Sequence, residues 1–135
     1  PVAGIFDQIQ TAVEDILLIC KKNGSKSVWI GGHSVGATLA ANLLHDKEWR
    51  NSMNKKNLFQ LIKGLILISG IYNLRPLLKT SYNTALNLTE DEIETFSFNT
   101  MDTRKLSQVS DMKIILAVGE CDSPIFIEET KHYSQ

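Results

Sequence analysis

Three short apolar runs constrain the fold of this chain most strongly, because longer segments of helical character separate them. The runs are residues 27–30, 65–68 and 114–118, and the last two are apolar at consecutive positions instead of alternate ones. That pattern is typical of strands in a parallel sheet whose two faces are both covered. The chain order of helix, strand, helix, strand, helix, strand and helix therefore predicts an α/β domain with three parallel strands and flanking helices.

The first half of the sequence predicts two helices and a polar connection. Residues 5–20 place apolar side chains on one helix face, and Asn23-Gly24 predicts the end of that helix. Residues 34–45 predict a buried helix. The polar stretch 46–57 is interpreted as a surface connection, with Trp49 as a surface anchor.

Two further helix starts follow in the second half. Thr89 and Glu92 form the T-x-x-E pattern of a capping box. Ser123-Pro124 combines an N-cap residue with a proline at the first helical position. Between the second run and Thr89, residues 70–88 are predicted to be irregular.

Charge and cysteine content exclude several classes of partner. The 135 residues carry 14 Lys+Arg against 15 Asp+Glu, whereas nucleic acids and anionic membranes require a large basic field. We therefore expect a small-molecule substrate, with no nucleic acid and no membrane. Cys20 and Cys121 form neither a disulfide framework nor a metal-binding spacing, so no metal and no cofactor are expected, and a cytoplasmic setting is the default. No leader and no apolar stretch long enough to cross a bilayer is evident.

The first apolar run ends in a motif with chemical meaning. Gly32-His33-Ser34-Val35-Gly36 matches G-x-S-x-G between a strand pattern and a helix pattern. Such a turn strains the serine backbone, and a side chain at either glycine is expected to clash with the neighbouring elements. The motif predicts Ser34 as a nucleophile at the carboxyl end of the sheet, with the backbone amide of Val35 in an oxyanion hole. The alternative is a glycine-rich turn in which Ser34 only caps the helix.

Two other glycine-loop patterns fit less well. The dinucleotide pattern G-x-G-x-x-G fails because its middle glycine falls on His33. The phosphate-loop pattern fits residues 31–38 except at its lysine, where this chain has Ala37. Nucleotide binding remains an alternative without the cation that would reach the terminal phosphates.

A serine nucleophile requires a base and an acid that orients the base, here in the chain order Ser, acid, His. Asp122 directly follows the third run and is the predicted triad acid; the alternative is that it helps to cap the next helix. Asp111 precedes that run and is expected at the wrong end of the sheet. Tyr72 follows the second run, where it either lines a substrate pocket or packs in the core.

No histidine is well placed as the base. His33 neighbours Ser34, but its side chain is expected to point away from the serine oxygen. His45 lies about 16 Å along the helix at 1.5 Å per residue, and His132 belongs to the last helical pattern. The triad base is therefore unknown and is expected beyond Gln135.

Three segments of this chain, residues 31–37, 69–77 and 117–124, resemble the kynurenine formamidases (arylformamidases), a family of α/β-hydrolases, as do residues 80–83 and 86–92. The resemblance implies a partial α/β-hydrolase fold with a nucleophile elbow after the first strand, Ser34 as the nucleophile and Asp122 as the triad acid. It implies a hydrolase that converts N-formyl-L-kynurenine to L-kynurenine and formate in tryptophan catabolism, and it allows a homodimer.

The family's upstream H-G-G loop and downstream catalytic histidine have no counterpart between Pro1 and Gln135. Residues 1–135 are therefore expected to be a fragment, the central to C-terminal part of a single α/β-hydrolase domain, and to be inactive in isolation. Two alternatives remain. One is a general carboxylesterase of the same fold, and the other is a non-catalytic α/β-hydrolase-like binding module.

Overall fold

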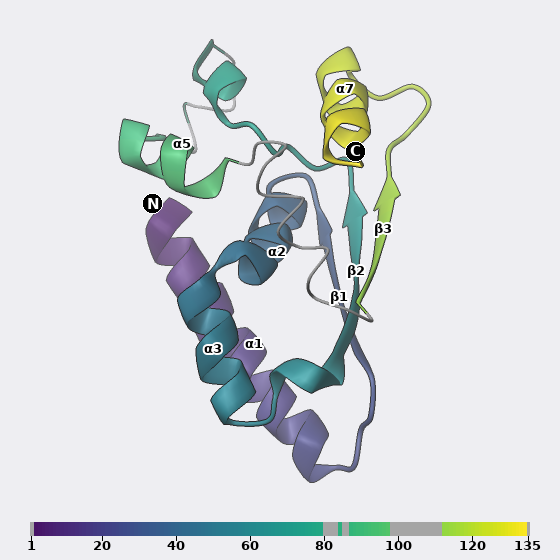
Figure 1. The fold of residues 1–135 in the computed structure, drawn as a ribbon. Coiled ribbons are helices and arrows are strands. Elements are labelled where there is room, and N and C mark those ends of the chain that lie inside the picture. The colour runs from purple at the N-terminus through teal and green to yellow at the C-terminus, as the bar shows by residue number, and fades with distance from the viewer. Residues whose placement is uncertain (1, 80–83, 85–86, 98–111, 135) are drawn as a thin grey trace.

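The computed structural model describes residues 2–79, 84, 87–97 and 112–134 (Figure 1). The expectations for residues 80–83, Leu86 and Asp111 fall outside these ranges. Among the described residues, no helix is long and apolar enough to span a bilayer.

A single sheet of three parallel strands forms the framework of the described chain. The strands are β1 (Val28–His33), β2 (Ile62–Ile68) and β3 (Lys113–Ala117), in the spatial order β1-β2-β3. Gly32 pairs with Leu67, and Leu67 pairs with Leu116, so all three strands end at one edge of the sheet. The predicted parallel α/β architecture is confirmed, although β2 begins three residues earlier than its apolar run indicates.

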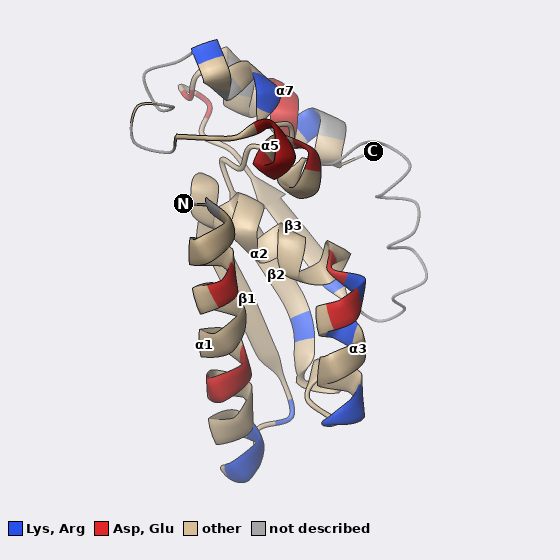
Figure 2. Cartoon of the chain, turned by 90° about the vertical axis from the view of Figure 1, so that its left-hand side faces the viewer, with Lys and Arg blue, Asp and Glu red and all other residues tan. Residues whose placement is uncertain are grey.

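The helices lie on one side of this sheet and at its carboxyl end (Figure 1). In the order of the chain they are α1 (Val2–Lys22), α2 (Val35–His45), α3 (Lys47–Lys55), α5 (Glu90–Phe96) and α7 (Pro124–Tyr133), with short 3-10 turns at Phe59–Leu61 and Arg75–Lys79. The capping box at the start of α5 is confirmed, since the Thr89 side chain accepts from the Glu92 amide and the Glu92 side chain accepts from the Thr89 amide. Figure 2 shows the acidic first turn of α5, where negative charge stabilises a helix N-terminus.

The interpretation of residues 46–57 as a surface connection is wrong, because most of this stretch is α3. Asp46 caps the helix, and its carboxylate accepts from the Trp49 amide at 3.0 Å. Trp49 and Met53 are both buried, so Trp49 is a core residue and not a surface anchor. Their spacing of one helical turn puts them on one face, but two apolar side chains are too few to reveal a helix in the sequence.

Two buried polar residues of α2 attach the neighbouring segments to it. The Thr38 hydroxyl donates to the Ile71 carbonyl at 2.5 Å, which holds the loop that follows β2. The Asn42 side chain donates to the carbonyls of Thr38 and Phe96, and the second bond fixes the end of α5. Because buried donors are costly when unpaired, these bonds specify where the two segments lie against α2.

The second face of the sheet remains open in the described part of the chain. Strand register places Trp29, Ile66, Ile68 and Ile115 on this face, and Trp29 and Ile115 are 40% and 49% exposed. The Trp29 ring lies across Gly64, where an added Cβ would come within 2.7 Å of it. The apolar pattern predicts cover on both faces, whereas the described helices cover one. Contiguous exposed apolar surface of this kind favours association.

We expect the 135-residue chain on its own to self-associate through this open face. The double substitution Ile66→Thr/Ile115→Thr should lower its average mass in sedimentation or light-scattering experiments, because it reduces apolar area while retaining β-branched side chains. As a matched control, Leu65→Thr changes the adjacent, fully buried position of β2. It should destabilise the fold by about 3 kcal/mol without reducing self-association. A monomeric parent chain would contradict the expectation.

Candidate active site

Ser34 occupies the turn between β1 and α2 in a strained backbone conformation. Its φ is 57° and its ψ is −120°, a region that residues other than glycine rarely adopt. The Ser34 amide donates to the Ile68 carbonyl at 2.9 Å, which continues the β1–β2 ladder by one residue. Its side chain makes no hydrogen bond that caps α2, so the alternative in which Ser34 only caps the helix is not what the structure has. Ser34 thus lies half-buried at the carboxyl edge of the sheet, and its role as a nucleophile stays a prediction.

The two glycines of the motif have different surroundings. A Cβ at Gly32 would lie 2.6 Å from the Ala37 amide nitrogen and closer still to the Gly36 carbonyl, so glycine is required there. A Cβ at Gly36 would meet nothing within 4 Å in the described structure. The expected clash is therefore found at Gly32, and the expectation for Gly36 is wrong. The difference arises because Gly32 approaches the helix backbone, whereas Gly36 is exposed on α2.

Val35 is the first residue of α2. The first N–H groups of a helix have no acceptor within the helix and carry the positive end of its dipole. The Val35 amide directly follows the serine, which is the position that an oxyanion-hole donor requires.

Asp122 lies in the loop between β3 and α7 and accepts a hydrogen bond on each carboxylate oxygen. The Ser69 hydroxyl donates to Oδ2 at 2.5 Å, and the Ser123 amide donates to Oδ1 at 3.1 Å. The hydrogen bond from Ser69 is the main cause that lowers the pKa of Asp122, and backbone donors and His33 act in the same direction against partial burial. The carboxylate is thus stabilised as an anion.

Ser69 is a residue of this region that the sequence interpretation did not single out. It follows β2 directly, as Ser34 follows β1, and its amide donates to the Ala117 carbonyl at 2.7 Å. The parallel register therefore brings Ser34 and Ser69 to the same edge of the sheet. The hydrogen bond between Ser69 and Asp122 places Asp122 at that edge as well. The sequence signal that could have identified Ser69 is that it directly follows β2, as Ser34 directly follows β1.

Neither histidine whose side chain is described forms a triad with Ser34 and Asp122. His33 is the last residue of β1, and His45 ends α2 with its Nε2 3.2 Å from the Tyr133 hydroxyl. His132 belongs to α7, and its side chain is outside the described structure. In the part of the chain that is described, no histidine hydrogen-bonds to Asp122, so the base remains unassigned.

Tyr72 is buried instead of lying open at the edge of the sheet. Its ring stacks on Tyr133 with centroids 4.1 Å apart and an interplanar angle of 14°. Burial is the larger cause that raises the pKa of Tyr72, and the charge of Glu129 adds to it. These contacts are those of a packing residue, and a role for Tyr72 in lining a substrate pocket stays a prediction.

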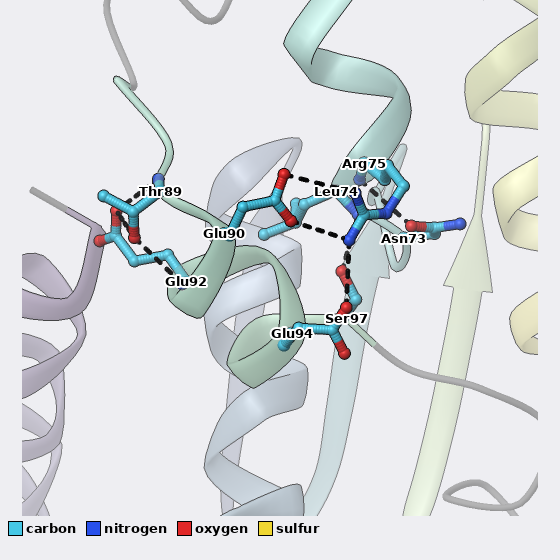
Figure 3. Close-up of polar contacts among 8 residues, drawn as sticks. All are labelled: Asn73, Leu74, Arg75, Thr89, Glu90, Glu92, Glu94 and Ser97. Carbon is cyan, nitrogen blue, oxygen red and sulfur yellow. Dashed lines mark hydrogen bonds and ion pairs between the residues drawn. The ribbon is translucent and has the colours of Figure 1, made fainter.

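The loop after β2 is held by side chains from two helices. The Glu129 carboxylate of α7 accepts from the amides of Tyr72 and Asn73, both at 3.0 Å. On the other side, the Ser97 hydroxyl accepts from the Leu74 amide at 2.9 Å (Figure 3). Arg75 pairs with Glu90 and Glu94 on the exposed side of α5 (Figure 3), where screening by water leaves little energy in such pairs.

Two further properties of the described residues are relevant to the site, namely whether they could hold a metal ion and which of them line a cavity. No group of three His, Cys, Asp or Glu side chains among the described residues could hold a metal ion. A cavity of about 490 Å³ lies between α1, the end of α2 and α5, with Phe6, Asn42 and His45 in its lining. Ser34 and Asp122 are not part of that lining.

Comparison with known proteins gives kynurenine formamidases of three organisms among the relatives of this chain. The chain is 34% identical over 110 residues to kynurenine formamidase of Danio rerio and 36% identical over 107 residues to that of Salmo salar, with 78% of this chain covered in both. It is 30% identical over 111 residues to the Drosophila melanogaster enzyme, with 80% of the chain covered. The matches take in 34%, 34% and 36% of the relatives, so the chain spans about a third of their length. No protein-family model matches.

Among solved structures, the chain superimposes on a protein from Silicibacter sp. that was assigned as a thioesterase. The TM-score is 0.72 with 25% sequence identity, and the match covers 98% of this chain and 45% of that one. This structural match, together with the strained serine after β1, identifies the architecture as an α/β-hydrolase fold. Within that class, the chain is related in sequence to the kynurenine formamidases.

The glycine pair gives a matched test of the turn. We expect Gly32→Ala to disrupt the junction of β1 and α2, because its Cβ would overlap helix backbone that cannot move independently. Gly36→Ala should be tolerated and should stabilise α2 by about 1 kcal/mol, the difference in helix propensity. Chemical denaturation of both variants measures the effect. Equal losses at the two positions would contradict this account of the turn.

Glu129 is expected to stabilise the loop after β2. Glu129→Ala would leave the Tyr72 and Asn73 amides without their acceptor and should cost about 1–2 kcal/mol in the free energy of unfolding. The neighbouring Glu128 is a matched control, since its 3.9 Å pair with Lys131 is exposed, and Glu128→Ala should change stability by less than about 0.5 kcal/mol. Faster hydrogen exchange at the Tyr72 amide in Glu129→Ala alone would locate the effect in the loop.

Proposed function

We propose that this chain carries the nucleophile and the triad acid of a serine hydrolase that acts on N-formyl-L-kynurenine. The observation that carries the proposal is the strained Ser34 at the tight turn between β1 and α2, with φ 57° and ψ −120°. Residues keep such a conformation where the surrounding structure imposes it, and such sites concentrate at catalytic positions. Asp122, an ionised carboxylate at the same edge of the sheet, supplies the second element.

The reaction follows from these roles. A histidine base, which is not assigned in this chain, removes the Ser34 proton as the oxygen attacks the formyl carbon. The Val35 amide stabilises the negative oxygen of the tetrahedral intermediate. The intermediate collapses with cleavage of the C–N bond, the aryl amine leaves with the proton from the base, and a formyl-serine ester remains. Water, deprotonated by the same base, then hydrolyses the ester to formate and restores Ser34.

Asp122 acts through the base in this scheme. Its carboxylate is stabilised as an anion by Ser69 and Ser123, so it can fix the orientation of an imidazole and stabilise the imidazolium that forms. The hydrogen bonds from Ser69 and Ser123 leave further lone pairs on the two oxygens for that contact.

The choice of substrate rests on the relatives, all three of which are named kynurenine formamidases. A second candidate is ester or thioester hydrolysis, which the shared fold and 25% identity with the Silicibacter protein support. Both reactions proceed through an acyl-serine and differ in the leaving group. Substrate comparison therefore separates them, whereas labelling of the serine alone does not.

A cytosolic location and a homodimer complete the proposal. The free Cys20 and the free, exposed Cys121 support the location, because unpaired thiols suit a reducing compartment. The dimer rests on the family resemblance, and sedimentation of the native protein tests it.

Substitution of Ser34 tests the proposal in the full-length native protein. We expect fluorophosphonate labelling of the wild type and hydrolysis of N-formyl-L-kynurenine in preference to aryl esters and thioesters. Ser34→Ala should abolish labelling and reduce kcat on the order of 10⁴–10⁶-fold, since the covalent step is lost. Ser27→Ala, at the opposite end of β1, is the control and should leave both unchanged. Undiminished turnover in Ser34→Ala would refute the nucleophile, and a preference for esters would favour the second candidate.

A further inference from the structure

The hydroxyl of Ser69 links the middle strand of the sheet to the proposed triad acid. Ser69 is 5% exposed, with φ 50°, and its amide is fixed to the Ala117 carbonyl at 2.7 Å. Its hydroxyl therefore extends from a rigid point between β1, which leads to Ser34, and β3, which leads to Asp122. The contact joins residues 53 positions apart in the chain.

We propose that Ser69 is a positioning residue of the hydrolase, whose hydroxyl holds the Asp122 carboxylate in the orientation that the triad base requires. The inference rests on the proposed function, because it gives Ser69 a role through the acid. Ser69 touches neither the nucleophile nor the substrate in this account.

The geometry around Asp122 explains why such a residue is needed. Asp122 follows β3, which lies at the edge of the described sheet, and it belongs to an exposed turn before α7. The Ser123 amide comes from the adjacent residue of the same loop, so it moves with Asp122. Ser69 is the donor that comes from a different element. Its bond to Oδ2, with the Ser123 bond to Oδ1, fixes the rotation of the carboxylate plane relative to the sheet.

Helix capping does not account for the contact between Ser69 and Asp122. Ser123 accepts from the Phe126 and Ile127 amides at the start of α7, so its carbonyl already serves the first turn of the helix. The Asp122 side chain accepts from Ser69 and from the adjacent Ser123 amide, the Gly119 amide of the same loop also stabilises its charge, and none of these donors belongs to α7. The remaining alternative is that the contact only attaches the loop to β2. Its loss would then leave kcat unchanged, whereas loss of a positioning contact lowers kcat.

Two substitutions separate the hydroxyl from the backbone conformation of Ser69. Ser69→Ala removes the hydroxyl and keeps a side chain at positive φ, whereas Ser69→Gly removes the hydroxyl and relieves that strain. In the full-length native protein, both should lower kcat for N-formyl-L-kynurenine about tenfold with little change in KM. Ser97→Ala is the control, because it removes another hydroxyl that holds the loop after β2 without touching Asp122. Wild-type kcat in Ser69→Gly would overturn the proposal.

A double-mutant cycle tests whether Ser69 acts through Asp122. In an Asp122→Asn background, Ser69→Ala should have no further effect on kcat, since the anion that it orients is gone. Independent, multiplied losses would show that Ser69 acts elsewhere and would overturn the proposal.

A readout that needs no activity separates failure of this inference from failure of the proposed function. Titration of the Asp122 carboxyl carbon by NMR should give a raised pKa in Ser69→Ala and in Ser69→Gly and an unchanged pKa in Ser97→Ala. A raised pKa with no hydrolysis by the wild type would retain the contact and refute the function. An unchanged pKa in both Ser69 variants would refute the contact, whatever the activity.

Discussion

The close approach of Gly32 to the backbone of α2 is the constraint on which the rest of this site depends. With no Cβ at this residue, the chain turns from β1 into α2 within a single position, and that position is Ser34. The turn fixes three things together: the position of Ser34, the helix-start amide of Val35 and the direction in which α2 leaves the sheet. Since α2 also carries Thr38 and Asn42, the same turn sets where the neighbouring segments attach.

The carboxyl edge of the sheet is then completed by contacts from side chains to backbone. The loop after β2 is attached to α2 by Thr38, to α7 by Glu129 and to α5 by Ser97. Each bond joins elements that are distant in sequence, and each satisfies a backbone group that the loop itself leaves unpaired. The exposed ion pairs of Arg75 (Figure 3) contribute less to stability, because water screens them. The loop geometry thus depends on a few hydrogen bonds that are buried or partly buried.

The fold was largely predictable from sequence, because the signals that specify it are local. Consecutive apolar residues marked β2 and β3, the Thr89–Glu92 pair marked α5, and Ser123-Pro124 marked α7. Helix α3 escaped prediction because its burial rests on Trp49 and Met53 alone within a polar stretch. The strand pattern also indicated cover on both faces, but Trp29 and Ile66 are exposed on the open face. Apolar composition indicates that a face is suited to burial, but it does not identify the segment or partner that covers it.

The candidate site was predictable only where one segment specifies it. Five consecutive residues contain the whole turn around Ser34, so a motif could reveal it, although the sequence overstated the need for glycine at residue 36. The position of Asp122 followed from strand order, but its state depends on a donor from another strand. A serine after a strand is too common to carry meaning by itself. It acquires meaning when the parallel register places its hydroxyl against a carboxylate, and that register is a property of the assembled sheet.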